Sequence, residues 1–149
     1  METVEPGYSR PSVRGDVTPA AEAVIATACP GAAVEPWTGG ASQHPYWGPW
    51  RQVATGYATD EAVRFRASSG GAVTALAQFA LSSGLVDRVV HIAADPQHPT
   101  RNIVVVSSDE DQIALGAGSR YASSSPLADI ERLLAEGGAF AFIGKPCDV

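Results

Sequence analysis

The segment RFRASSGGAVTALAQFALSSGL, Arg64–Leu85, decides how this chain folds. Its apolar residues recur at helical spacing from Ala72 to Ser83, and Gly84 stands where a helix commonly ends. Upstream, Arg64–Arg66 has the pattern of a polar strand end. The segment therefore predicts a strand that turns through Ser68–Gly71 directly into a helix, as in an α/β sheet.

The turn Ser68–Gly71 combines two hydroxyls with two glycines that leave the backbone uncovered. The first N–H groups of a helix lack intrahelical partners and carry partial positive charge, so a helix that starts here can bind an anion, most commonly a phosphate. Arg64 and Arg66 add positive charge just upstream. The turn predicts a phosphate-bearing cofactor; the alternative is a helix start with small residues for close packing.

Composition narrows the class of protein. The chain has 149 residues and a net charge of −6, which argues against nucleic-acid binding because that requires a basic face. No apolar run approaches the roughly 18 residues of a membrane span, and the N-terminus lacks a signal-peptide pattern. Cys29 and Cys147 lie far apart and form no disulfide framework. We expect a cytoplasmic, reduced protein.

Strand and helix patterns alternate along the rest of the chain. Residues 1–17 read as a flexible tail, and Thr18-Pro19 as the N-cap and first residue of a helix that ends at Cys29. Strand patterns cover 50–58, 86–93, 102–108 and 139–143, with helices over 109–116 and 126–136. This alternation predicts an α/β fold with a mixed, partly parallel sheet flanked by helices. Because the sequence stops right after a buried strand, we expect residues 18–149 to be an incomplete module that lacks its C-terminal part.

Two glycine-containing motifs allow more than one interpretation. Gly116–Tyr121 begins like a dinucleotide fingerprint, but Tyr121 replaces the third glycine and a short helix precedes it. It is either a flexible connector or a second cofactor loop in which Arg120 meets a phosphate. Gly144-Lys145 is not a P-loop, because Pro146 replaces the Ser/Thr that would hold magnesium. Lys145 still follows a strand, where open α/β sheets bind ligands.

Other reactive side chains give weaker signals. His91, Asp95 and His98 are spaced loosely across a strand end and a turn, and we expect them to belong to a surface loop rather than a metal site. Cys147 follows a Lys-Pro turn and could be a metal ligand, a reactive thiol or an inert residue, whereas Cys29 reads as a small hydrophobic residue. No catalytic residue is identified by these patterns.

Three segments in the same order carry a family resemblance. They are ATGYATDEAVRFRASSGGAVTALAQFALSSGLVD (54–87), GAGSRYASSSPL (116–127) and AFIGKPCDV (141–149). Together they resemble the coenzyme F420 hydrogenase/dehydrogenase beta subunit family, over roughly residues 29–149. The resemblance implies an FAD-binding oxidoreductase module that transfers electrons between iron–sulfur centres and a deazaflavin or another acceptor, with coenzyme F420 as a candidate substrate.

The same resemblance implies roles for particular residues. Those implied to bind FAD are Arg66, Ser68, Ser69, Gly70, Gly71, Thr74, Gly118, Ser119, Arg120, Tyr121, Gly144, Lys145 and Pro146. Arginine at position 120 stands where the family has lysine. Cys147 is implied to be a ligand of a 4Fe–4S cluster in the complete protein. Cys29, which matches a family position before the core, is a second candidate metal ligand.

The resemblance also implies what surrounds this chain. Family members continue past the Pro-Cys turn into a part with further cysteines, so the cluster and an electron-transfer partner subunit or domain would belong to the complete protein. Two other hypotheses remain: a redox-silent module that binds a nucleotide at the same helix terminus, and an inactive fragment.

Overall fold

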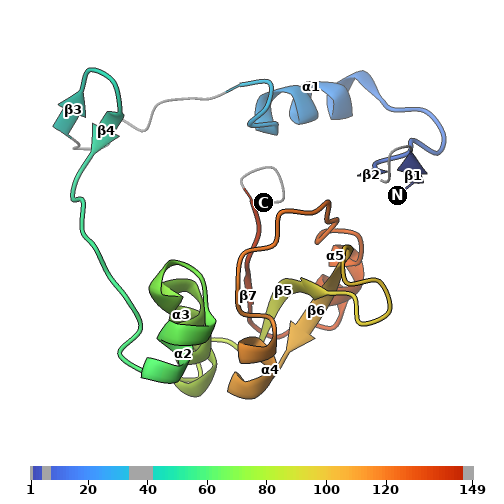
Figure 1. The fold of residues 1–149 in the computed structure, drawn as a ribbon. Coiled ribbons are helices and arrows are strands. Elements are labelled where there is room, and N and C mark those ends of the chain that lie inside the picture. The colour runs from blue at the N-terminus through green and yellow to red at the C-terminus, as the bar shows by residue number, and fades with distance from the viewer. Residues whose placement is uncertain (1, 5–7, 34–41, 146–149) are drawn as a thin grey trace. The chain divides into compact units, whose positions relative to one another are not determined.

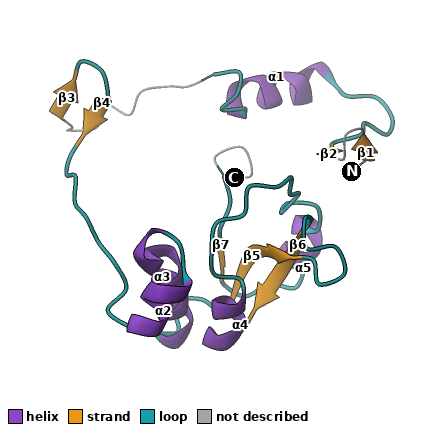
Figure 2. Cartoon of the chain, in the orientation of Figure 1, coloured by secondary structure: helices purple, strands orange, loops and turns teal. Residues whose placement is uncertain are grey.

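The computed structural model describes residues 2–4, 8–33 and 42–145. The chain divides into two units, Val13–Gly56 and a larger one that joins Met1–Ser12 to Tyr57–Val149. Figure 1 labels the elements and Figure 2 colours them by type. Within the described ranges, no helix is long and apolar enough to span a membrane.

The unit Val13–Gly56 contains one helix and one hairpin. Helix α1, Pro19–Ala28, begins as the sequence predicts, because the Thr18 hydroxyl accepts a hydrogen bond from the Ala21 amide at 3.2 Å. Strands β3 (Ser42–His44) and β4 (Gly48–Trp50) pair antiparallel. The strand predicted over 50–58 is wrong beyond Trp50, because that stretch has no partner strand and Val53 is 84% exposed.

The larger unit begins with a hairpin that the sequence did not indicate. Strands β1 (Glu2–Val4) and β2 (Tyr8–Arg10) pair antiparallel where we expected a tail without structure. After Tyr57, the first element is a helix rather than a strand end: α2, Glu61–Arg66. The Asp60 carboxylate accepts from the Val63 amide at 2.8 Å and starts this helix, so the strand predicted to end at Arg64–Arg66 is wrong.

A short 3₁₀ turn, η1 (Ser69–Gly71), connects α2 to α3 (Ala72–Ser82). The predicted helix and its end at Gly84 are confirmed, with φ of +71° at Gly84. Strand β5 (Arg88–Ala94) follows and pairs antiparallel with β6 (Asn102–Ser107).

The last three elements complete the sheet and cover it. Helix α4 (Glu110–Leu115) lies within the helix predicted over 109–116 and is capped by Asp109, which accepts from the Gln112 amide at 2.8 Å. Helix α5 spans Ile130–Ala135, so the helix predicted from Pro126 begins four residues late, after a turn. Strand β7 (Phe140–Phe142) pairs parallel with β5 and is a half-buried edge strand rather than a fully buried one.

The sheet has the order β6-β5-β7 and is mixed, which confirms the predicted α/β class with a partly parallel sheet. The two faces of the sheet contact different helices, because neighbouring residues of a strand point to opposite faces. Val89 joins Ala77 of α3 and Ile113 of α4 in the core. On the opposite face, Arg88 donates to carbonyls at the end of α5, Leu133 and Gly137, at 2.9 and 2.7 Å.

Candidate functional site

Helix α3 starts from a left-handed turn. Ser69, Gly70 and Gly71 follow one another with φ of +52°, +65° and +74°. A side chain with a Cβ pays about 1–2 kcal/mol in this region, and strained backbone of this kind clusters at ligand sites. No side chain of the described residues caps the helix at Gly71. The N-terminus of α3 therefore has no capping side chain among the described residues.

The two glycines of this turn have a packing role. A Cβ on Gly71 would lie 3.1 Å from both Cγ1 and the carbonyl oxygen of Val63, and 3.2 Å from Cβ of Ala58. The Gly71 amide donates to the Ser68 carbonyl, and the Ala58 amide donates to the Gly70 carbonyl at 2.7 Å. Neither glycine lines the cavity described below. The structure thus separates Gly70 and Gly71, which hold α2 and α3 together, from the serines.

Ser68 connects two of the predicted motifs. Its Oγ accepts a hydrogen bond of 2.8 Å from the backbone amide of Ser119, 51 residues away. Because that bond uses a lone pair of the hydroxyl, Ser68 keeps its own O–H proton to donate elsewhere. Gly118, the neighbour of Ser119, has φ of +113° and open space where a Cβ would stand. The Gly-Ser-Arg-Tyr loop therefore lies against the start of α3.

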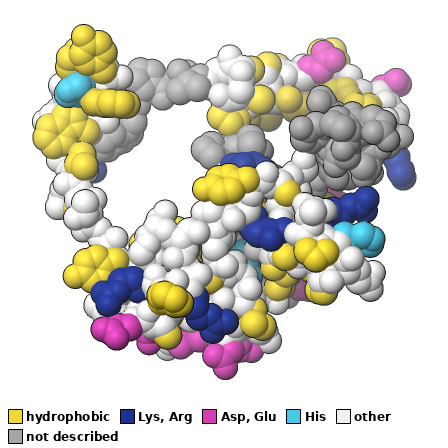
Figure 3. All heavy atoms as spheres, viewed as in Figure 1, with side chains coloured by type: hydrophobic (Ala, Val, Ile, Leu, Met, Phe, Trp, Pro, Cys, Tyr) yellow, Lys and Arg dark blue, Asp and Glu magenta, His cyan; other side chains and the backbone are white. Residues whose placement is uncertain are grey.

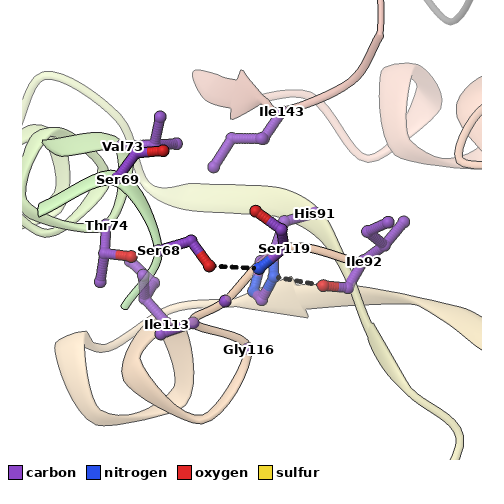
Figure 4. A pocket seen from close by; sticks show the side chains of 12 residues that line it. Ser68, Ser69, Val73, Thr74, His91, Ile92, Ile113, Gly116, Ser119 and Ile143 are labelled. Carbon is purple, nitrogen blue, oxygen red and sulfur yellow. Dashed lines mark hydrogen bonds between the residues drawn. The ribbon is translucent and has the colours of Figure 1, made fainter. Parts of the chain in front are cut away.

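These two motifs enclose a cavity of about 220 Å³, which we call the central cavity (Figure 4). The hydroxyls of Ser68, Ser69 and Ser119 face apolar side chains across it. Among the described residues that line it, His91 is the one titratable side chain. These described residues are Ser68, Ser69, Val73, Thr74, His91, Ile92, Ile113, Gly116, Ala117, Gly118, Ser119 and Ile143.

Two further cavities share walls with the central one. The Arg66 cavity, about 360 Å³, shares Thr74 and Ala117 with it and reaches Arg66 of α2. The Lys145 cavity, about 230 Å³, is lined by Gly144 and Lys145 among others. It shares Ile92, Gly118 and Ile143 with the central cavity. The central cavity therefore adjoins both the Arg66 cavity and the Lys145 cavity.

The cations of the site differ in how they are held. Arg120 lines the Lys145 cavity, but its guanidinium donates to the Asn102 side chain at 2.9 Å and to the carbonyls of Pro99 and Arg101 at 2.7 and 3.2 Å. It therefore holds the turn between β5 and β6. Nζ of Lys145 lies 3.4 Å from Oγ of Ser124.

The remaining charged and aromatic residues of the two motifs point away from the central cavity. Arg64 pairs with Glu61 at 3.6 Å, and Figure 3 shows basic and acidic side chains side by side over α2. Tyr121 is 97% exposed and lines none of the three cavities. Of the predicted cofactor residues, the structure thus places Ser68, Ser69, Thr74, Gly118 and Ser119 around the central cavity. Gly70, Gly71 and Tyr121 line none of the three cavities.

Of the two predicted metal ligands, the structure describes Cys29. Cys29 is exposed and belongs to the unit Val13–Gly56. Cys147 and Pro146 lie outside the described residues. Over the described ranges, no three His, Cys, Asp or Glu side chains are close enough to hold a metal ion.

His91 is the site residue that the sequence analysis missed. We expected a surface loop with Asp95 and His98, but His91 lies within β5, is 5% exposed and lines the central cavity. Burial lowers its pKa, so the imidazole is neutral at pH 7. The available signal was its place inside the apolar run VVHI. Asp95 and His98 do form an exposed pair at 3.3 Å, and the Gln97 amide, which donates to Asp95, lowers the pKa of that carboxyl.

Comparison with known proteins places this geometry in a family. No curated protein matches the chain. Among solved structures, it is similar to a chain of the xenon-derivatised F420-reducing NiFe hydrogenase complex from Methanosarcina barkeri, with 26% identity and a TM-score of 0.49. The match covers 54% of this chain and 27% of that one, so this chain spans about a quarter of its length. A family model, coenzyme F420 hydrogenase/dehydrogenase, beta subunit N-terminal region, matches residues 53–131. The chain therefore belongs to the coenzyme F420 hydrogenase/dehydrogenase beta subunit family, as its motifs predict.

Proposed function

We propose that this chain is the FAD-binding redox module of a coenzyme F420 hydrogenase/dehydrogenase-type oxidoreductase. In the complete protein it would transfer electrons between iron–sulfur centres, on a partner subunit or domain, and a deazaflavin or another acceptor. The observation that carries the proposal is the bond between Ser68 and Ser119, because it joins two distant motifs around one cavity at a helix N-terminus.

The described residues fit a flavin dinucleotide. The central cavity alone is smaller than the roughly 300–1,000 Å³ of common ligand sites, so a dinucleotide would also have to occupy one of the two cavities that share lining residues with it. Hydroxyls and the uncapped start of α3 suit a diphosphate, and Lys145 supplies a cation in the adjoining cavity. Val73, Ile113 and Ile143 offer apolar walls to a ring system.

Each group of residues has a separate task in this proposal. A bound flavin supplies hydride and single-electron chemistry, while the protein binds, orients and shields it. Ser68, Ser69 and Thr74 donate hydroxyl hydrogen bonds at the start of α3. The Gly118-Ser119 backbone closes the cavity from the opposite side. Lys145 attracts the negative charge of the ligand, and the apolar walls exclude water from the ring.

The described residues do not fit an iron–sulfur cluster. Such clusters need several thiolates, and the structure describes one cysteine, Cys29, which is exposed. We assign the cluster to other parts of the complete protein and derive no step from it.

Flavin titration of the full 149-residue chain under anaerobic conditions tests the proposal. We expect saturable quenching of FAD fluorescence with one flavin per chain. Lys145→Gln should weaken FAD binding about tenfold and reduce its dependence on salt, because a charged partner of the ligand is lost. Arg14→Gln changes the net charge equally in the unit Val13–Gly56 and is the matched control.

The outcomes separate the hypotheses. If ADP raises the thermal midpoint of the chain and FAD does not, the chain is a redox-silent nucleotide-binding module. If neither ligand binds at millimolar concentration, the FAD proposal fails for this chain. If FAD binds but Lys145→Gln and Arg14→Gln behave alike, the role given to Lys145 is wrong.

A further inference from the structure

His91 is a polar residue in a strand position that otherwise belongs to the core. Its neighbours Val89 and Val90 are fully buried, and the imidazole itself is 5% exposed. Both nitrogens of a buried imidazole need partners, because an unsatisfied polar group costs about 1–3 kcal/mol. The partners that the structure provides differ in quality between the two nitrogens.

Nε2 of His91 has a strong partner within the protein. It lies 2.8 Å from Oγ of Ser107, which is completely buried on the neighbouring strand β6. Val89, not His91, stands directly opposite Ser107, so the two polar residues are diagonal neighbours on one face of the sheet. This pair satisfies Nε2 and fixes the plane of the ring.

Nδ1 has only a weak contact. It lies 3.3 Å from the carbonyl oxygen of Ile92, the next residue, which is longer than the usual 2.9–3.0 Å. A carbonyl can only accept, so Nδ1 carries the proton in this neutral ring. Nε2 is then the acceptor, and the Ser107 hydroxyl donates to it. The contact with the Ile92 carbonyl therefore places the proton on Nδ1, and the Ser107 hydroxyl, which can donate or accept, accommodates this tautomer.

The backbone of Gly116 lies close to this side of the ring. A Cβ at Gly116 would stand 2.5 Å from Cε1 and 2.8 Å from Nδ1 of His91, closer than side chains pack. Both residues line the central cavity, as Figure 4 shows. Because position 116 is a glycine, no side chain of that residue stands against the edge of the imidazole that carries the N–H.

We propose that His91 is a ligand-binding residue of the central cavity, whose neutral Nδ1–H donates a hydrogen bond to an acceptor oxygen of the bound nucleotide. Ser107 fixes the ring through Nε2 and accommodates the required tautomer, and Gly116 places no side chain against the donor edge. The ligand oxygen replaces the weak contact with Ile92. This inference rests on the proposed FAD site. It adds a hydrogen-bond donor that lies in neither the turn Ser68–Gly71 nor the motif Gly116–Tyr121.

Two substitutions separate binding from structure, because each keeps one half of the imidazole. The amide of Gln reaches the position of Nε2, so His91→Gln keeps the partner of Ser107 and loses the donor at Nδ1. The shorter amide of Asn reaches the position of Nδ1, so His91→Asn keeps the donor and loses the bond to Ser107. We expect His91→Gln to weaken FAD binding about three- to tenfold with little change in the thermal midpoint. His91→Asn should unfold at a lower temperature and keep its affinity within about twofold.

A second measurement tests the tautomer without ligand. ¹⁵N NMR of the imidazole distinguishes protonated from unprotonated nitrogens, and we expect the proton on Nδ1, with a shift of that signal when FAD is added. The inference is overturned if His91→Gln binds FAD as tightly as the natural chain, or if the free protein carries the proton on Nε2. Should the natural chain itself fail to bind FAD, the proposed function fails first, which the same titration reveals.

Discussion

The Ser119 amide donates to Oγ of Ser68 at 2.8 Å and so fastens the loop before Arg120 to the start of α3. Both residues are exposed, so this single bond, rather than burial, fixes the geometry of the cavity entrance. Sequence patterns placed each serine in a separate cofactor motif. Their contact makes the two motifs parts of one site.

Ser68→Ala should loosen this loop without unfolding the chain. Loss of an acceptor for a backbone amide costs about 0.5–1.5 kcal/mol, so amide hydrogen exchange at Ser119 should accelerate roughly three- to tenfold. Ser108→Ala removes an exposed hydroxyl outside the central cavity and is the control. Unchanged exchange at Ser119 in the Ser68 variant would show that the loop is held by other contacts.

Gly71→Ala should lower the free energy of unfolding by about 2–4 kcal/mol, since it combines a left-handed φ with a crowded Cβ. Gly84→Ala has nearly the same φ, +71°, but open space around the new Cβ. It should therefore cost only the roughly 1–2 kcal/mol of the backbone conformation. Urea unfolding of both variants measures the difference, and equal losses would contradict the close approach of Gly71 to Val63.

The buried His91 should make stability depend on pH in a defined window. Because burial lowers the pKa of His91 in the folded chain, the unfolded chain takes up a proton first as the pH falls through about 6.5. The contribution of His91 to the free energy of unfolding is then complete above this pH. It decreases as the pH falls further, until the pH passes the pKa of His91 in the folded chain. The steepest slope is about 1.4 kcal/mol per pH unit for one proton.

Chemical unfolding between pH 5 and pH 8 measures this slope. His91→Gln should flatten it, whereas His98→Gln, at an exposed histidine, should leave it in place. A slope that survives in His91→Gln would assign the effect to other groups.

Arg120 should contribute more to stability than an exposed arginine. Arg120→Ala removes three hydrogen bonds that hold the turn between β5 and β6, with an expected loss of about 1–3 kcal/mol. A double-mutant cycle with Asn102→Ala should give a coupling of about 0.5–3 kcal/mol. Arg64→Ala, which breaks an exposed ion pair, should change stability by less than about 1 kcal/mol. Equal losses for both arginines would mean that Arg120 is free to serve a ligand instead.

The predictions from sequence that were wrong have a common origin, because different local patterns compete along the same stretch of chain. The capping carboxylate of Asp60 starts a helix in a stretch whose alternation resembles a strand, and a strand needs a partner that residues 51–58 lack. His91 was placed on the surface because it was grouped with Asp95 and His98 along the chain. Its neighbours in the strand were the better guide, since a residue between buried valines shares their environment.

The sequence by itself determined those features that depend on interactions within three or four residues along the chain. The caps at Thr18 and Asp109 and the helix end at Gly84 follow from side chains and backbone freedom that act locally. The family motifs were equally readable, because they are short and contiguous. The tertiary structure alone decided that Ser68 meets Ser119 and that His91 meets Ser107. Such contacts form only when the sheet and its helices dock, since a hydrogen bond between distant residues depends on the positions of whole elements.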